Sequence, residues 1–267
     1  MRPYNISNSL IKAIDEYALG EGGDSCGKQL KAIYLDKTVE LHPSDSMKLG
    51  QYFEFLATGA KLRDGSEPKP ELTQKGELTS EYKRTLVQAE NFKIQMKYYG
   101  FEIIDTGVKW EYEFEGMNIK GILDILAKDR FGNELIIDLK YSGLLEDKWN
   151  DLGWAKEQLP HRRKLISQPK LYKWLGYKIL GKELPFYFFL HSSTNSIDRK
   201  IYKINTGQID SLCEEVEKLI RFTDDTIQYH LMTGFETRPQ MKRCLDCPLL
   251  AECQEAFTLP KIEEIFV

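Results

Sequence analysis

The chain has 267 residues, of which 42% are hydrophobic and 29% charged, so it has the composition of a globular protein that can bury a substantial core. Its net charge of −4 argues against a surface coated in positive charge, although a local basic groove is compatible with it. No apolar run approaches the roughly 20 residues of a membrane span, and residues 1–6 lack the apolar core of a secretory signal. We therefore expect a cytoplasmic protein without membrane partners, a setting in which disulfides are rare.

The first hundred residues have the pattern of helices. The third helix has Leu49, Phe53 and Leu56 on one side, and the fourth begins at a Thr79 or Ser80 cap and ends at Gly100. A charged connection rich in glycine and proline separates these two helices. The expected helices span residues 6–18, 27–36, 46–60 and 80–99.

From Val108 onward the pattern changes to strands. The expected strands span residues 108–115, 119–127, 134–141, 185–191 and 199–205. A basic helical section, interrupted near Pro160, reaches about residue 180, and a last helix covers 208–232. This order predicts one α/β domain over 1–267, with a helical part (1–100), a core (101–233) and a cysteine-bearing tail (234–267).

The most informative segment is an expected hairpin that carries two aspartates. Asp124 stands between apolar residues in one strand, and Asp138 is followed two positions later by Lys140 in the next. Because side chains alternate between faces, Asp138 and Lys140 share a face. If the hairpin folds about Phe131, Asp124 lies opposite Asp138, with Cβ atoms roughly 5 Å apart.

Two carboxylates this close repel each other unless something compensates. A Mg²⁺ ion takes hard oxygen ligands and keeps several waters, so two carboxylates suffice to hold it. Bound metal would lower the pKa of a coordinated water, and Lys140 could position that water or neutralise a phosphoryl transition state. A solvated hairpin face with an Asp–Lys ion pair is the alternative, and these motifs alone leave both open.

Three motifs in order carry a family resemblance: Gly121 to Asp124, Asp138 to Lys140, and Gln168 to Tyr172. They resemble the GxxD, (D/E)xK and QxxxY pattern of the RecB-like branch of the PD-(D/E)xK nucleases, over roughly residues 50 to 253. The resemblance implies a restriction-endonuclease-like core, in which a mixed central sheet is flanked by helices. By itself, the pair Gln168 and Tyr172 is also typical of an ordinary amphipathic helix.

The resemblance also implies roles for individual residues. Asp124 and Asp138 would be ligands of Mg²⁺ or Mn²⁺, with the backbone carbonyl of Leu139 completing the set, and Lys140 would be the catalytic lysine. Gln168 and Tyr172 would lie one helical turn apart, near the scissile phosphate.

Two further positions extend this comparison. The slot of an upstream ligand is taken by Glu54, four residues after Gly50, although an exposed helix glutamate is the alternative. Pro169 departs from the pattern. Because proline fits the first turn of a helix, we expect that helix to begin near Ser167.

Four cysteines form a split set, with Cys26 far upstream of Cys244, Cys247 and Cys253. The fifth, Cys213, has the setting of a residue on a helix face. One cysteine before the core and three after it resembles the iron–sulfur RecB-like exonucleases, including CRISPR-associated and AddB-type members. This resemblance implies a 4Fe–4S cluster that joins the tail to Cys26, a C-terminal cysteine clip. Tetrahedral Zn²⁺ and free thiols are the alternatives.

The stretch from Lys156 to Lys182 is the most basic part of the chain, and Lys and Arg bind phosphates without reading base sequence. Trp149, Trp154 and Trp174 could stack on unpaired bases or belong to the core. A solvated charged face is the alternative for the basic residues. The candidate DNA contacts are Arg162, Arg163, Lys164, Lys170 and Lys173.

Together these features predict a Mg²⁺- or Mn²⁺-dependent deoxyribonuclease, and the resemblance favours an exonuclease acting on single-stranded DNA ends. Repair, recombination, CRISPR adaptation and phage DNA processing are the alternatives for its pathway. No phosphate-binding GKT or GKS loop is present, so unwinding would require a helicase partner from another chain. A non-catalytic DNA-binding or scaffold subunit is the main alternative. A restriction-type endonuclease is a third.

Overall fold

The computed structural model describes residues 2–18, 26–40, 42–143, 145, 163–237, 244, 247–250 and 253, with the backbone alone for 163–167. The chain divides into two compact units. Unit 1 comprises residues 1–8 and 43–220, and unit 2 comprises residues 9–42 and 221–267. Within the described parts, no helix combines the length and apolar character needed to cross a membrane.

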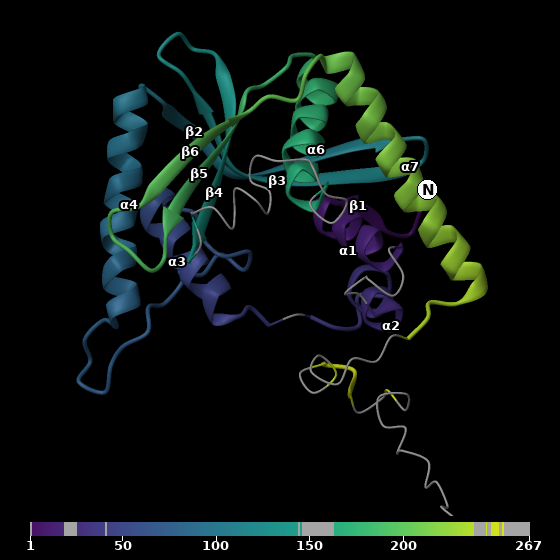
Figure 1. Ribbon diagram of the computed structural model, residues 1–267, viewed down its shortest axis with the longest axis horizontal. Coiled ribbons are helices and arrows are strands. Elements are labelled where there is room, and N and C mark those ends of the chain that lie inside the picture. The colour runs from purple at the N-terminus through teal and green to yellow at the C-terminus, as the bar shows by residue number, and fades with distance from the viewer. Residues whose placement is uncertain are drawn as a thin grey trace, which may run out of the picture. The chain divides into compact units, whose positions relative to one another are not determined.

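Unit 1 is built on a mixed six-stranded sheet (Figure 1). The strands run in the order β1-β3-β4-β5-β6, and β2 pairs with β3 along its other edge. The β1–β3 and β4–β5 pairs are parallel and the others antiparallel. The strands are β1 (Asn5–Ser7), β2 (Glu102–Phe114), β3 (Met117–Lys128), β4 (Glu134–Ser142), β5 (Phe186–Ser192) and β6 (Arg199–Ile204).

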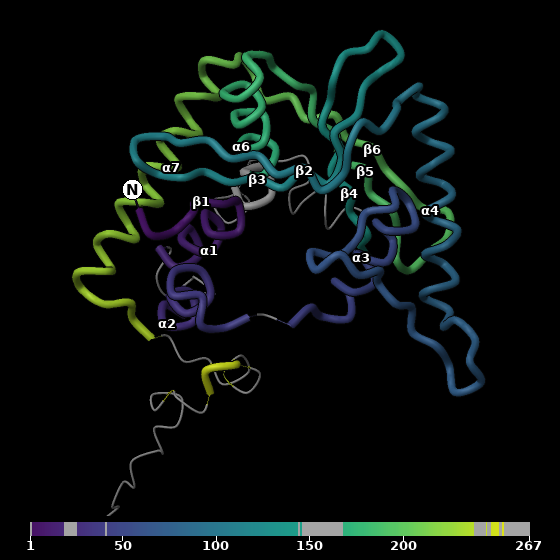
Figure 2. Tube along the Cα trace, turned by 180° about the vertical axis from the view of Figure 1, so that it is seen from behind, coloured from purple at the N-terminus to yellow at the C-terminus, as the bar shows by residue number. Residues whose placement is uncertain are grey.

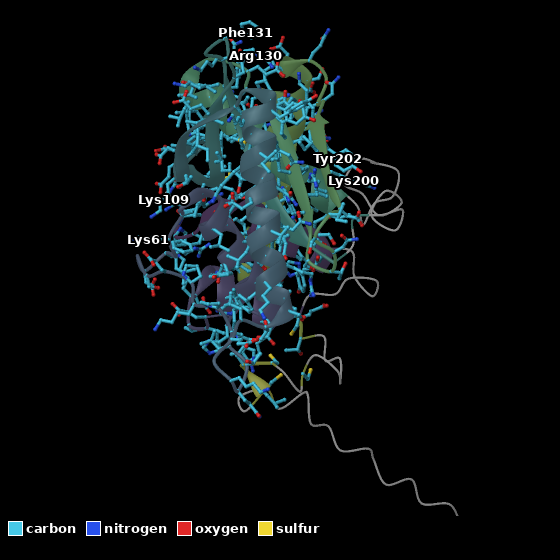
Figure 3. The ribbon with its side chains drawn as sticks, turned by 90° about the vertical axis from the view of Figure 1, so that its left-hand side faces the viewer. Lys61, Lys109, Arg130, Phe131, Lys200 and Tyr202 are labelled. Carbon is cyan, nitrogen blue, oxygen red and sulfur yellow. The ribbon has the colours of Figure 1, made fainter. Side chains whose placement is uncertain are left out.

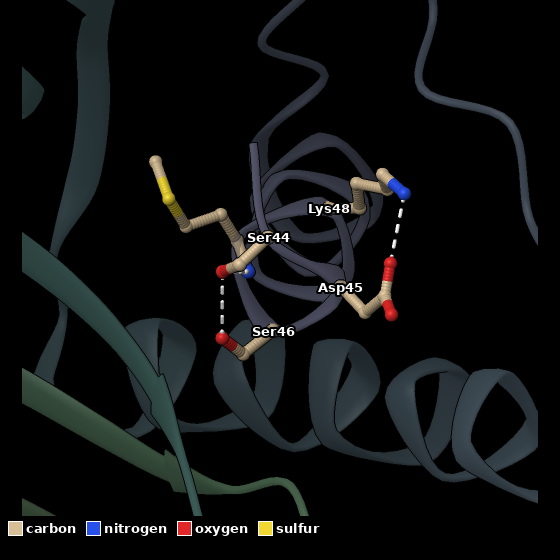
Figure 4. Close-up of polar contacts among 5 residues, drawn as sticks. Ser44, Asp45, Ser46 and Lys48 are labelled. Carbon is tan, nitrogen blue, oxygen red and sulfur yellow. Dashed lines mark hydrogen bonds and ion pairs between the residues drawn. The ribbon is translucent and has the colours of Figure 1, made fainter. Parts of the chain in front are cut away.

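The helices α3 (Asp45–Thr58) and α4 (Ser80–Tyr99) begin and end at local signals. The hydroxyl of Ser44 accepts the N–H of Met47. Figure 4 shows the hydrogen bond between the hydroxyls of Ser44 and Ser46 and the Lys48–Asp45 ion pair at the start of α3. Thr79 caps α4 in the same way. Gly59 and Gly100 end the two helices with φ angles of 80° and 69°, a left-handed conformation in which glycine has no steric cost.

One face of the sheet packs against α3 and α4. Phe53 of α3 and Phe92 of α4 meet Ile125, Ile137 and Phe189 in a continuous apolar cluster. Alternate residues of β4 and β5 therefore point away from it, toward the face on which α6 (Arg163–Leu180) lies. The helices thus cover both faces of the sheet (Figures 1 and 2).

Strand β3 packs against different helices along its length. Near its start, a Cβ on Gly121 would lie 2.8 Å from Leu175 of α6, whereas Ile125 and Ala127 pack against α3 and α4. These residues are separated by even numbers of positions and would share one face of a flat strand. One side of β3 therefore contacts α6 near the start of the strand and α3 and α4 near its end.

Unit 2 contains α1 (Asn8–Ala18), the short helix α2 (Gly27–Leu30), which continues as a π-helix over Lys31–Leu35, and the later part of α7 (Ile209–Thr233). The ring of Tyr17 lies edge-on to His230 at 4.8 Å, and its hydroxyl accepts the N–H of Glu236 at 2.8 Å. Gly27 donates its N–H to the carbonyl of Glu236 at 2.9 Å. A Cβ on Gly27 would lie 2.5 Å from that oxygen, so only glycine permits this approach.

Most expected elements are present, and the expected helix over 80–99 has the observed bounds. Strand β1 was not expected, and β2 begins six residues earlier than expected, at Glu102 and not Val108. The expectation that α6 begins near Ser167 is wrong, because the helix begins at Arg163 and contains Pro169. Since proline has no N–H, the helix lacks one backbone hydrogen bond at this position.

Candidate active site

The candidate site lies where β3 and β4 part. Their ladder runs from the Lys128–Glu134 pair to the Ile125–Ile137 pair, which confirms the register expected for a hairpin centred on Phe131. Asp129 holds the turn, because its Oδ1 accepts the N–H groups of Phe131 and Asn133 at 2.8 and 2.9 Å.

The ladder ends one position before the two aspartates. There the N–H of Leu139 donates to Oδ2 of Asp124 at 2.9 Å, and this side-chain contact replaces a strand-to-strand bond. On the same edge of β3, β1 pairs with residues 118–120. Residues 121–124 therefore lie between β1 and β4, and we call this opening the fork.

Asp138 lies at the inner end of the fork and is 1% exposed. Its carboxylate contacts the ammonium of Lys140 and accepts a hydrogen bond from the Nε2 of Gln168. Tyr172, one helical turn after Gln168, is buried, with its ring 6.4 Å from that of Phe186. The structure thus brings Asp124, Asp138 and Lys140 together with the two α6 residues expected beside them.

Several charged side chains lie close together at the fork and shift one another's pKa values. Burial and the charge of Asp138 raise the pKa of Asp124 well above its usual range, and the same two causes raise the pKa of Glu54. Burial would lower the pKa of Lys140, but the charges of Asp138 and Asp124 outweigh it and leave that pKa raised. Burial and Asp138 raise the pKa of Tyr172 to about 12, so its hydroxyl stays protonated. Glu54 therefore belongs to the same electrostatic group as the aspartates, and we call Glu54, Asp124 and Asp138 the carboxylate cluster.

The carboxylate cluster suits a hard divalent cation, because carboxylate oxygens are the ligands that Mg²⁺ and Mn²⁺ prefer. A cation would also relieve the repulsion that raises these pKa values. Within the described parts of the chain, no three His, Cys, Asp or Glu side chains already converge as a metal site. In this conformation Lys140 and Gln168 hold the Asp138 carboxylate.

Gly121 connects the fork to α6, a role that the sequence did not reveal. A Cβ at this position would lie 2.8 Å from Leu175 and 3.0 Å from the ring of Tyr172. Real Cβ atoms essentially never lie within 3.0 Å of another atom, so any other residue would require the side chain of Leu175 to shift. The glycine thus allows Tyr172 to lie directly over the strand that carries Asp124.

The basic residues of α6 that the structure describes are largely paired. Lys170 binds Glu215 at 2.6 Å, and Lys173, 3% exposed, binds Glu183 and Thr206 at 2.7 Å. Lys173 is therefore a structural residue in this fold, which corrects its expected contact with DNA. Trp174 is fully buried and belongs to the core. Arg162, Trp149, Trp154 and the side chains of Arg163 and Lys164 lie outside the described residues.

All five cysteines lie among the described residues, and none of them forms a disulfide. Cys26 and the three tail cysteines belong to unit 2. Cys26 directly precedes Gly27, which is bonded to Glu236, so the chain on both sides is brought together eight positions before Cys244. The backbone N–H groups of Cys247 and Cys253 donate to the carbonyls of Cys244 and Leu250, each at 3.2 Å.

A second buried polar group lies on the face of the sheet opposite Asp138, and we call Thr85, Gln88, Asn91 and His191 the amide cluster. The Nε2 of Gln88 donates to the carbonyls of Asn195 and Asp198 at 2.7 and 3.1 Å. Its Oε1 accepts from Nδ1 of His191 at 3.0 Å. Burial, with a smaller effect from Arg199, lowers the pKa of His191 to about 3, so the imidazole is neutral.

Comparison with known proteins gives a fold and no family. No protein-family model matches the sequence. No curated protein matches it either. Among solved structures, the chain is similar to a protein from Eubacterium rectale that is provisionally described as an exonuclease, with a TM-score of 0.66 and 21% identity over 98% of this chain and 91% of that one. It also aligns with SSO0001 at 14% identity over 97% of this chain and 89% of that one, but the TM-score of 0.41 carries no argument. The first likeness establishes a shared fold over nearly the whole chain.

Proposed function

We propose that this protein is a metal-dependent deoxyribonuclease that hydrolyses phosphodiester bonds at the fork. The observation that carries the proposal is the end of the β3–β4 ladder, where Asp124 and Asp138 stand beside Lys140. Two carboxylates held close together in partly buried strands repel each other and destabilise the fold. A bound cation that contacts a phosphate would compensate this repulsion and place the two carboxylates in a catalytic role.

The chain's own residues supply positioning and charge. Asp124, Asp138 and the carbonyl of Leu139 would hold a Mg²⁺ or Mn²⁺ ion, with Glu54 as a further carboxylate. When bound, the ion would supply an acidified water and stabilise negative charge on the phosphate. Lys140 keeps its proton, because Asp138 and Asp124 raise its pKa, so it acts as a fixed positive charge toward the phosphoryl oxygens.

Gln168 and Tyr172 complete the positioning. The amide of Gln168 donates to Asp138 and holds that carboxylate in one orientation. The protonated hydroxyl of Tyr172 remains a hydrogen-bond donor at neutral pH, since its pKa is about 12. Both side chains come from a helix that Gly121 allows to approach the strand closely.

We further propose exonucleolytic action on single-stranded DNA ends, alongside a helicase or recombination partner. Two points support this proposal: the motif order that resembles RecB-like nucleases, and a shared fold with a protein provisionally described as an exonuclease. A Zn²⁺ ion or free thiols in unit 2 are compatible with this activity, but we propose a 4Fe–4S cluster on Cys26, Cys244, Cys247 and Cys253. Gly27 supports it by bringing Cys26 next to the segment that leads to the tail.

The catalytic proposal is tested with Lys140→Ala. End-labelled single- and double-stranded DNA would be incubated with Mg²⁺ or Mn²⁺, and the expected result is a loss of about a hundred- to a thousandfold in the initial rate. Lys182→Ala is the matched control, because Lys182 forms an exposed ion pair with Glu134 and should leave the rate unchanged. Cleavage that survives Lys140→Ala unaltered would remove the assignment.

The cluster proposal has a separate readout. Protein purified without oxygen would be assayed for iron and acid-labile sulfide and for visible absorbance. Four irons per chain that are lost in Cys247→Ser are expected. A colourless protein containing stoichiometric zinc would replace the cluster with the tetrahedral alternative and leave the nuclease proposal intact.

A further inference from the structure

Tyr141 connects the strand of the candidate site to the two helices on the other face of the sheet. It follows Lys140 directly in β4, and because successive side chains of a strand alternate, it points to the face opposite Lys140. Figure 3 views the molecule from this side, where α4 lies in front of the sheet and Arg130 and Phe131 mark the β3–β4 turn. The half-buried ring of Tyr141 packs against the apolar cluster that contains Phe53.

Two contacts hold the ring of Tyr141 in place. Its face stacks on Phe53 of α3, with 4.8 Å between the ring centroids and 15° between the planes. At its far end, its hydroxyl forms a 3.1 Å hydrogen bond with the hydroxyl of Thr85, a fully buried residue of α4. A ring that is stacked on one face and hydrogen-bonded at its tip has a defined orientation.

Phe53 rests on a pair of side chains from the sheet. Tyr141 and His191 pair across β4 and β5, and the ring of Phe53 lies 5.0 Å from that of His191. Phe53 is 1% exposed, so this surface and the apolar cluster enclose it. The strand that carries Asp138 and Lys140 therefore also determines where this part of α3 lies.

Glu54 is the next residue of α3 after Phe53. Neighbouring residues of an α-helix keep a fixed spacing, so a shift of Phe53 is a shift of Glu54. The charges of Asp138 and Lys140 act on the Glu54 carboxyl, yet no three described carboxylates already converge as a metal site. How closely α3 approaches β4 therefore decides whether Glu54 reaches a cation held by the two aspartates.

We propose that Tyr141 is a positioning residue of the cation site. Its ring holds Phe53, and through Phe53 it sets the distance from Glu54 to the aspartates of the fork. Tyr141 touches neither the cation nor the substrate and acts only through Glu54. This inference rests on the proposed function, because it concerns the cation that the proposed function requires.

Tyr187 provides a matched control for Tyr141. It lies on β5, is half-buried and packs against the same apolar cluster on the same face of the sheet. Its ring has different neighbours, since Phe101 lies 5.5 Å away and the ammonium of Lys203 lies 5.8 Å from its centroid. Leucine at either position removes one ring from this face, but only Tyr141→Leu removes the ring that stacks on Phe53.

The experiment measures binding of Mn²⁺ to the full chain without DNA, with free Mn²⁺ followed by electron paramagnetic resonance. We expect Tyr141→Leu to weaken Mn²⁺ binding about tenfold, because residues that orient metal ligands contribute on this scale. Tyr187→Leu should bind Mn²⁺ like the wild-type protein. Tyr141→Phe should also retain the affinity, since its ring can still stack on Phe53.

A double-mutant cycle distinguishes positioning of Glu54 from a general loosening of the fold. Glu54→Gln should weaken Mn²⁺ binding, and Tyr141→Leu added to it should cause no further loss, because its effect passes through the carboxylate. Phe53→Leu alters the same contact from the helix side and should weaken Mn²⁺ binding as Tyr141→Leu does. It takes the place of Tyr141→Leu if a urea titration shows that the latter does not fold.

Three outcomes would overturn the role of Tyr141: losses that add in the double variant, an equal loss in Tyr187→Leu, or Tyr141→Phe as weak as Tyr141→Leu. Failure of this inference is distinguishable from failure of the proposed function. If Glu54→Gln weakens Mn²⁺ binding and Tyr141→Leu does not, the role of Tyr141 alone is removed. A wild-type protein that binds no Mn²⁺ removes both.

Discussion

The carboxylate cluster and the amide cluster lie on opposite faces of the same sheet. Both contain buried polar side chains, but those of the carboxylate cluster repel one another and those of the amide cluster form hydrogen bonds. The amide cluster contains neutral groups, and both the donor and the acceptor of Gln88 are engaged, while the Nε2 of His191 has no hydrogen-bond partner among the described residues. The carboxylate cluster concentrates groups of like charge, and burial together with the charge of Asp138 raises the pKa values of Asp124 and Glu54. The first arrangement stabilises the fold, and the second destabilises it.

This difference in charge and hydrogen bonding distinguishes buried polar residues that stabilise the fold from those that serve a functional site. Carboxylates with pKa values raised by one another cluster at functional sites, where a ligand can compensate the repulsion, whereas a neutral hydrogen-bonded network needs no ligand. Burial alone does not distinguish them, since Asp138 and Gln88 are both almost inaccessible. Substitutions in the carboxylate cluster should therefore lower activity and raise stability, whereas substitutions in the amide cluster should lower stability.

The largest effect is expected for Asp124→Asn. The asparagine still accepts the N–H of Leu139 but no longer repels Asp138, so hydrolysis should fall about a hundredfold or more while stability rises. A carboxyl with a raised pKa costs stability at every pH above that pKa, so the neutral side chain removes this cost at pH 7. We expect a gain of about 1 kcal/mol in the unfolding free energy, measured in urea with chelator. A less stable variant would contradict the description of the carboxylate cluster.

Gln88→Ala should give the largest loss of stability. It leaves two backbone carbonyls and the Nδ1–H of His191 without their partner, at a cost of about 3 kcal/mol. Gln95 on the same helix is the control, since its buried Oε1 has no partner among the described residues. Gln95→Met should therefore cost much less in the same urea titration. Similar losses for both variants would show that packing of α4, and not the amide cluster, dominates.

The third effect is a dependence on pH that originates at His191. A histidine whose pKa is lowered in the folded state stabilises the protein above pH 6.5, its value when unfolded, and loses that contribution as the pH falls toward about 3. Between pH 7 and pH 5 the loss should be about 2 kcal/mol. His191→Gln should flatten this part of the stability profile. A slope equal to that of the wild-type protein would mean that other groups cause the dependence.

The sequence predicted those elements whose signals are local. The helix Ser80–Tyr99 has its cap, its periodicity and its terminal glycine within its own residues. The register of β3 and β4 followed from a short turn and from alternation. Strand β1 could not be predicted in this way, because its three residues pair with a strand 113 positions later in the chain.

The site could be predicted in part for the same reason. Motif spacing placed Asp138 and Lys140 on one face, but the end of the ladder at Asp124 depends on a side-chain bond that no local pattern encodes. The burial of Lys173 depends on Glu183 and Thr206, which lie beyond its own helix. The stacking of Phe53 on Tyr141 depends on how α3 packs against β4.

The parallel pairing of β1 with β3 also constrains how the chain folds during synthesis. Residues 5–7 leave the ribosome more than a hundred residues before residues 118–120 of β3, with which they pair. This segment therefore stays unpaired until β3 has emerged. Contacts so distant in sequence slow folding, because a long loop must close before they form. Since β1 borders the fork, this side of the site is completed late, and the nascent chain should acquire the activity proposed above only after most of unit 1 has folded.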